Sequence, residues 1–143
     1  MTPKEYLQQY QYSVKRWRAA LEHLEELESI ATRITPLYGG EGGGGRHQSG
    51  DEKMQNAVDK IIDAKSRVSD ELEMLEATER EVVKTIDSVE NKTLRTLLYE
   101  RYINDKTFEL IAVKLNYSWR QTIRLHGTAL NSIRSILIKD GKI

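Results

Sequence analysis

The sequence contains no cysteine, only two prolines and a single phenylalanine among its 143 residues. The absence of cysteine excludes disulfides, thiolate catalysis and cysteine-ligated zinc or iron–sulfur sites. No apolar run approaches the roughly 18–20 residues that span a bilayer, so we expect no membrane segment. The first ten residues, MTPKEYLQQY, also lack the apolar core of a secretory signal. These absences lead us to expect a cytoplasmic protein that is rich in helix.

Residues that carry catalytic or metal chemistry are also scarce. The three histidines, His23, His47 and His126, share no metal-ligand spacing. Carboxylates are numerous, but nothing in their arrangement marks a pocket that would shift their pKa for acid–base catalysis. We therefore expect no metal, no cofactor and no enzymatic activity.

The chain carries 22 basic and 22 acidic side chains, which are unevenly distributed. Residues 51–90 hold 6 basic and 12 acidic groups, a net charge of −6, and residues 91–143 hold 10 basic and 4 acidic groups, a net charge of +6. A basic C-terminal part favours an anionic partner there. Mutual neutralisation of the two halves within one globule explains the asymmetry equally well.

Residues 4–34 are predicted to form one long helix. Apolar side chains recur at alternating four- and three-residue steps, which is a heptad pattern. This stripe consists of Tyr10, Val14, Trp17, Leu21, Leu24 and Ala31, with Glu28 filling the gap before Ala31, and it is widened near its end by Leu27, Ile30 and Ile34. Pro36 is predicted to end the helix, because the residue before a proline avoids the α region.

A glycine-rich stretch follows, with six glycines between positions 39 and 45. We expect a flexible loop over residues 39–52 that either allows two long helices to fold back on each other or lets the first helix dock on another subunit. The stretch lacks the Gly-Lys-Ser/Thr sequence of a phosphate-binding loop, which argues against nucleotide binding.

Residues 53–89 are predicted to form a second long helix with a clear heptad pattern. Nine of eleven consecutive heptad positions are apolar, and the exceptions are Lys65 and Glu79. The nine are Met54, Val58, Ile61, Val68, Leu72, Leu75, Val82, Ile86 and Val89. A two-helix hairpin cannot bury two such stripes fully, so we expect residues 1–90 to form a dimeric four-helix arrangement or to dock on the C-terminal domain.

Residues 91–143 are predicted to form three helices whose starts are marked by capping residues. Asn91 and Thr107 suit N-cap positions, and Ser118 with Gln121 forms a capping box that starts a helix at residue 119. Asn116 tolerates the left-handed conformation of a tight turn between helices. The pattern is that of a helix-turn-helix unit.

The polar residues of this unit are spaced for DNA recognition. In the major groove, arginine pairs with guanine and glutamine pairs with adenine. Base readout is therefore expected at the start of the last helix, from Trp119, Arg120, Gln121 and Arg124, although Trp119 has the alternative of packing inward. Phosphate contacts are expected from Lys106, Lys114, Ser118, His126 and Arg134, although His126 has the alternative of a surface or partly packed position.

Several stretches of the C-terminal part resemble region 4 of bacterial sigma factors. They are residues 98–103 (LYERYI), 107–112 (TFELIA) and 115–118 (LNYS), followed by 129–134 (ALNSIR), which resembles the end of that region. The whole chain resembles the sigma-region-4-like transcriptional regulators of RinA and ArpU type from phages and prophages of Gram-positive bacteria. Beyond those stretches, the resemblance to these regulators is carried by residues 34–36, the glycine-rich stretch, residues 56–58 with Ile61, and residues 124–127.

The resemblance implies binding to promoter DNA and activation of a phage or prophage operon, one route being contact with RNA polymerase. A complete sigma factor also carries an aromatic, basic domain that melts the promoter. Because residues 1–90 are predicted to form an acidic helical hairpin instead, we expect no autonomous sigma activity.

We therefore expect an all-α protein with a helical hairpin at 1–90 and a helix-turn-helix DNA-binding domain at 91–143. It would act as a sequence-specific transcriptional regulator on double-stranded DNA, as a homodimer or higher homo-oligomer. One alternative is a phage DNA-packaging recognition subunit, which would form a ring. The other is an adaptor that binds RNA polymerase without specific DNA readout, and a weak dependence on salt would distinguish it.

Overall fold

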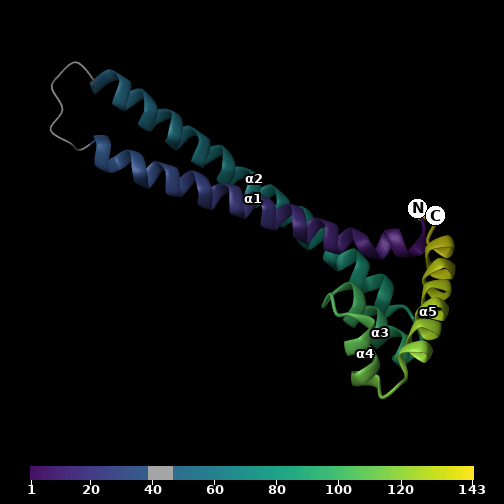
Figure 1. Cartoon of the computed structure of the whole chain (residues 1–143). Coiled ribbons are helices and arrows are strands. Elements are labelled where there is room, and N and C mark those ends of the chain that lie inside the picture. Colours follow the sequence, from purple (N-terminus) through teal and green to yellow (C-terminus); the bar gives the residue numbers. More distant parts are fainter. Residues whose placement is uncertain (39–46) are drawn as a thin grey trace. The chain divides into compact units, whose positions relative to one another are not determined.

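A computed structural model of the chain describes residues 1–38 and 47–143 (Figure 1). These residues form five α-helices and no strand, which confirms the all-α prediction. The helices are α1 (Pro3–Tyr38), α2 (His47–Asp87), α3 (Lys92–Tyr102), α4 (Phe108–Leu115) and α5 (Trp119–Lys139). The expected loop at 39–52 needs a correction, because residues 47–52 already belong to α2. Its remaining part, 39–46, lies outside the described residues.

The start of α1 has a capping box that the sequence reasoning missed. The backbone N–H of Glu5 donates to Oγ1 of Thr2 at 3.1 Å, and the backbone N–H of Thr2 donates to Oε2 of Glu5 at 2.8 Å. Pro3 is the first helical residue, where its missing N–H costs nothing. The signal was present in the sequence as Thr-Pro-Lys-Glu, and it moves the helix start from residue 4 to Pro3.

The prediction that Pro36 ends the first helix is wrong. The helix continues through Pro36 and ends shortly afterwards, at Tyr38. A proline removes one N–H donor and crowds the carbonyl one turn earlier. These effects weaken the last turn of a long helix but do not fix its end at the preceding residue.

The chain divides into two compact units. The terminal unit comprises residues 1–14 and 75–143, and the helix-pair unit comprises residues 15–74. Both α1 and α2 therefore contribute to both units. This division differs from the one at residue 90 that the sequence suggested, because the first 14 residues and the end of α2 pack with α3, α4 and α5.

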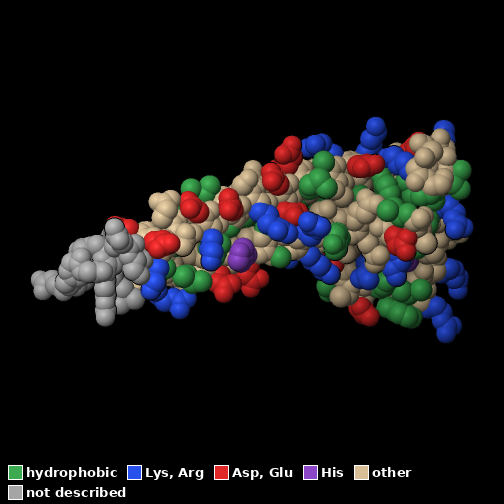
Figure 2. All heavy atoms as spheres, turned by 90° about the horizontal axis from the view of Figure 1, so that it is seen from above, with side chains coloured by type: hydrophobic (Ala, Val, Ile, Leu, Met, Phe, Trp, Pro, Cys, Tyr) green, Lys and Arg blue, Asp and Glu red, His purple; other side chains and the backbone are tan. Residues whose placement is uncertain are grey.

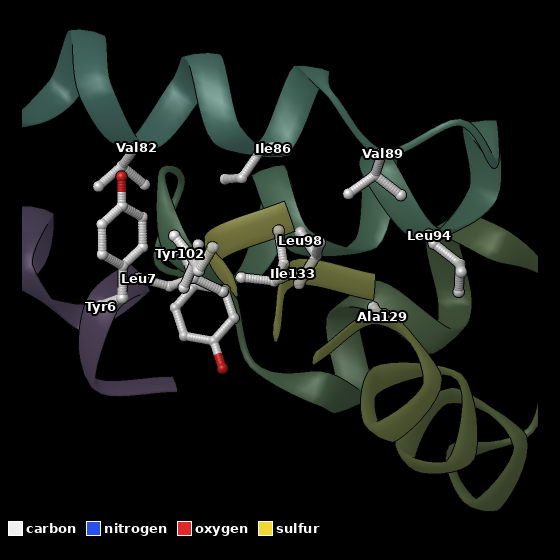
Figure 3. Packing of buried hydrophobic residues seen from close by; sticks show 11 residues of the cluster. Tyr6, Leu7, Val82, Ile86, Val89, Leu94, Leu98, Tyr102, Ala129 and Ile133 are labelled. Carbon is white, nitrogen blue, oxygen red and sulfur yellow. The ribbon is translucent and has the colours of Figure 1, made fainter. Parts of the chain in front are cut away.

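The terminal unit has a core to which α1, α2, α3 and α5 all contribute (Figure 3). The core consists of Tyr6, Leu7, Val82, Ile86, Val89, Leu94, Leu98, Tyr102, Ala129, Ile133 and Leu137. Burial of a large apolar side chain contributes about 1.5–3 kcal/mol, so a core of this size can hold α5 in place. The side chain of Tyr6 at the start of α1 is buried, and its hydroxyl is satisfied by Oγ1 of Thr85 at 3.0 Å.

The helix-pair unit consists of α1 from residue 15 to its end and of α2 up to residue 74, which lie side by side (Figure 1). Arg16 on α1 forms a bidentate ion pair with Glu71 on α2, with Nη2 at 2.8 Å from Oε1. The Arg16 guanidinium holds the pKa of the Glu71 carboxyl below its usual value of 4.5.

The stripe of α2 that turns inward in this unit is rotated relative to the predicted one. The buried and half-buried residues of α2 between 54 and 71 are Met54, Ala57, Ile61, Ala64, Val68 and Glu71. Val58 and Leu72, which the heptad pattern assigned to the interface, are exposed instead. Small residues such as Ala64 let two helices approach closely, which favours this rotation over one that buries the larger Val58 and Leu72.

Candidate nucleic-acid interface

The interface begins at the tight connection between α4 and α5. Asn116 follows α4 in the left-handed conformation, with φ 58° and ψ 39°, and Tyr117 donates its N–H to the Ala112 carbonyl at 3.0 Å. Ser118 then caps α5, because its Oγ accepts the Gln121 N–H at 3.1 Å. The predicted roles of Asn116 and Ser118 in the backbone are confirmed, and they fix where α5 starts.

The inner side of α5 anchors this helix in the terminal unit. Its buried residues are Thr122, Ala129, Ile133 and Leu137. Thr122 is a polar residue in a buried position of α5, and its hydroxyl donates a hydrogen bond to the Ser118 carbonyl at 2.9 Å. The hydroxyl is thus satisfied within the helix, and the methyl group is free to pack.

The outer side of α5 carries the residues that the sequence assigned to base readout. Trp119, Arg120, Gln121 and Arg124 are all exposed in the first two turns of the helix. The alternative that Trp119 packs inward is thereby excluded, since 53% of its surface is exposed. The helix contains arginines and lysine but no aspartate or glutamate from Trp119 to Lys139. An extended exposed face without negative charge is therefore available to an anion.

Arg134 and Gly127 lie further along α5, and both are exposed. An exposed side chain is what the predicted phosphate contact of Arg134 requires, and that contact stays a prediction. A Cβ added at Gly127 would meet nothing within 4 Å, and α5 continues through this residue. The glycine therefore marks neither a close helix approach within the protein nor an end of the helix.

Lys106 and Lys114, two of the expected phosphate contacts, are joined by a residue that the sequence reasoning did not assign. Nζ of Lys114 lies 2.6 Å from Oε1 of Glu100, and Nζ of Lys106 lies 3.0 Å from Oε2. Glu100 is buried on α3, and Asn104 donates to the same carboxylate at 3.3 Å. Hydrogen bonds from Lys114 and then Lys106 hold the pKa of the Glu100 carboxyl below 4.5. We call Lys106, Glu100 and Lys114 the ion cluster.

The ion cluster changes what its two lysines can do. The negative charge of Glu100 compensates one of the two positive charges of the lysines, so the cluster carries a net charge of +1 rather than +2. Both lysine side chains stay about half exposed, and each ammonium group keeps further donors. The one sequence signal for Glu100 was its position three residues after the buried Leu97, on the core side of α3.

His126 has a different environment from the one expected. Its Nε2 lies 2.7 Å from the Tyr102 hydroxyl, and its ring stacks on Tyr102 and meets the edge of Phe108. Burial, with the nearby charges of Arg101 and Lys4, lowers the pKa of His126 to about 4. The ring is then neutral near pH 7. The structure thus gives His126 a packing role in place of the expected phosphate contact.

Figure 2 shows how charged side chains are distributed over one face of the molecule. On the face turned to the viewer in Figure 2, red and blue side chains are mixed along the helix-pair unit. Around the edge of the terminal unit in the same view, blue Lys and Arg side chains are prominent. This face of the terminal unit therefore presents basic side chains to solvent.

Within the described ranges, 1–38 and 47–143, no group of three or more His, Asp or Glu residues could hold a metal ion. Over the same part of the chain, none of the helices combines the length and apolar character that crossing a bilayer requires. Comparison of the chain with protein-family models, with curated proteins and with solved structures gives no match.

Proposed function

We propose that the chain is a sequence-specific DNA-binding transcriptional regulator that inserts the first turns of α5 into the major groove. The observation that carries this proposal is the exposed set Arg120, Gln121 and Arg124 on a helix without acidic residues, directly after a tight turn. The resemblance to sigma-region-4-like phage regulators supports an operon of a phage or prophage as the target and activation as the outcome.

The chemistry of the three side chains suits base readout. An arginine donates two parallel hydrogen bonds to O6 and N7 of guanine, and a glutamine pairs in the same bidentate way with adenine. Arg120 and Arg124 are one turn apart, so they reach neighbouring base pairs. Trp119, exposed beside them, offers an apolar face to a thymine methyl or a sugar.

The remaining basic residues suit the DNA backbone. Arg134 is exposed on α5, and Lys106 and Lys114 present half-exposed ammonium groups from the ion cluster. Each phosphate neutralised by a cation releases counterions, so each contact adds about 0.9 to the slope of log affinity against log salt. Ser118 keeps its O–H as a donor, although its oxygen caps α5.

The test begins with selection of bound fragments from a random duplex pool, using the full chain near physiological salt. Arg124→Ala should then weaken binding to the selected site by about 1–3 kcal/mol and relax the base preference at one position. Arg134→Ala should weaken binding to all sequences alike and reduce the salt slope by about 1. Arg33→Ala, the same change at an exposed residue of the helix-pair unit, is the control. Equal losses for Arg124→Ala and Arg33→Ala would remove α5 as the reader.

A second function, binding of RNA polymerase or another protein without specific DNA readout, has one observation in its favour. Leu110 and Val113 on α4 are 58% and 76% exposed, which is unusual for large apolar side chains three residues apart on one helix. If this function holds, the random pool yields no enriched motif. Polymerase binding is then lost in a Leu110→Ser/Val113→Ser variant and retained in Arg124→Ala.

A further inference from the structure

The helix-pair unit has a second apolar stripe that the contact between α1 and α2 does not use. Val58, Ile62 and Leu72 on α2 are 39%, 59% and 38% exposed. Together with Lys65 and Ser69 they follow four- and three-residue steps along one side of the helix. We call this set the outer stripe. It lies beside the inward-facing residues, since Val58 follows Ala57 and Lys65 follows the buried Ala64.

The register of the two helices places the outer stripe opposite a charged flank. In an antiparallel pair, residues just before the inward positions of both helices share one flank, and residues just after them share the other. The residues just before the inward positions include four that line one groove together, namely Arg16, His23, Lys60 and Arg67. Leu21, which follows the buried Ala20, belongs to the second kind and is half-buried. It therefore lies on the flank of the outer stripe.

We propose that the outer stripe is a homodimer interface, on which the same flank of a second copy of this chain packs to form a four-helix arrangement. A stripe that is apolar at three of its five positions gains by packing on a like stripe, and a two-fold axis makes that contact self-complementary. This proposal goes beyond DNA recognition, because it concerns residues 15–74 alone.

The size of the flank fits a second copy. The part of α2 in this unit, residues 47–74, has a length of about 42 Å, and two helices side by side are roughly 20 Å wide. Contact over most of this flank would bury on the order of 600 Å² per copy, or about 1,200 Å² in total. That area is at the lower end of stable, specific interfaces.

Lys65 is the charged residue of the outer stripe, and it gives the proposal a sharp test. A polar residue in an apolar helix interface lowers stability in exchange for register or partner choice. Replacement of Lys65 by leucine should therefore tighten the dimer, whereas Ile62→Glu should separate it. Tighter association cannot result from a folding defect, so the two variants together separate the proposed contact from misfolding.

The experiment is sedimentation analysis of the full chain without DNA, over a concentration range from one to a hundred micromolar. We expect a wild-type dimer, at least tenfold weaker association for Ile62→Glu and at least threefold tighter association for Lys65→Leu. Met74→Glu is the matched control, because Met74 is an exposed apolar residue of α2 that precedes the inward-facing Leu75 and so lies on the charged flank. It should dissociate like the wild type. Circular dichroism checks that all variants keep their helix content.

A wild-type chain that remains monomeric, or that forms a larger ring, would overturn the proposal. A dimer that Ile62→Glu and Met74→Glu weaken equally would overturn it as well. Because the measurement contains no DNA, these outcomes are independent of whether α5 reads a sequence.

Discussion

The substitution Glu100→Gln tests the ion cluster and its link to DNA binding at once. Glutamine has almost the shape of glutamate but carries no charge. In the native protein the Glu100 carboxylate is buried and accepts Lys114 at 2.6 Å and Lys106 at 3.0 Å. The cluster joins α3, the segment after it and α4, so its loss should loosen the packing of α4 on α3.

The expected cost in stability follows from the exposure of each partner. A hydrogen bond to a charged group contributes about 1.5–3 kcal/mol, and breaking a fully buried pair costs about 3–5 kcal/mol. The side chains of Lys106 and Lys114 are 41% and 51% exposed, so water can solvate the ammonium groups after the change. The side-chain oxygen of glutamine can also still accept a hydrogen bond from one of the lysines. We therefore expect the free energy of unfolding at pH 7 to fall by about 1–3 kcal/mol.

Urea unfolding followed by circular dichroism measures this change. Glu76→Gln, at an exposed position of α2, is the matched control and should stay within about 0.5 kcal/mol of the wild type. The pKa of Glu100 is lowered in the folded state, so its contribution is present above pH 4.5 and is lost as the pH falls through the folded-state value. The gap between wild type and Glu100→Gln should therefore close in acid.

The same variant should bind non-specific DNA more tightly at low salt and lose affinity more steeply as salt rises. Release of Lys106 and Lys114 from the carboxylate makes more positive charge available to phosphates. A variant with unchanged stability at pH 7 would refute the ion cluster as a structural element. An unchanged salt slope, despite reduced stability, would refute the assignment of these two lysines to the DNA backbone.

Three further predictions concern the turn and α5. The pKa of His126 is lowered from 6.5 to about 4, so protonation of this histidine favours the unfolded chain. The free energy of unfolding should therefore fall by about 2 kcal/mol between pH 7 and pH 5 in the wild type but not in His126→Gln. An equal fall in both proteins, measured by unfolding titrations at the two pH values, would contradict this. Gly127→Ala should raise the free energy of unfolding by about 0.5–1 kcal/mol, because the added methyl group meets no atom, and a lower melting temperature would oppose it. Asn116→Val should lower the free energy of unfolding in urea by about 1–2 kcal/mol, because a β-branched residue is strained at φ 58°. Asn116→Gly should change it little, because glycine adopts this conformation readily. Similar losses for both variants would point to a role of the asparagine side chain instead.

The parts of the fold that the sequence predicted best are those decided by neighbouring residues. Asn91, Thr107 and Ser118 each cap a helix through a side-chain oxygen that accepts an N–H three residues later. Such a bond needs no other part of the chain, so its residue pattern is visible in the sequence. The starts of α3, α4 and α5 were therefore predicted correctly from these caps.

The face of α2 that turns inward was not predictable in the same way. The heptad pattern fits a stripe through Ala57 and Ala64 or a neighbouring stripe through Val58 and Leu72. Hydrophobicity alone prefers the second, because valine and leucine gain more from burial than alanine does. Which stripe faces α1 depends on how closely two helices can approach, and this depends on residues distant in the sequence.

The same limit applies to the charge of the candidate interface. A count over residues 91–143 gives +6 and treats every lysine as available to DNA. The folded unit places Glu100 between Lys106 and Lys114, and burial keeps His126 neutral. The helix α5 carries arginines and lysine without any acid, so its positive charge is not balanced within the helix. The exposed basic residues of α5, rather than the total charge of residues 91–143, are therefore what supports α5 as the proposed DNA reader.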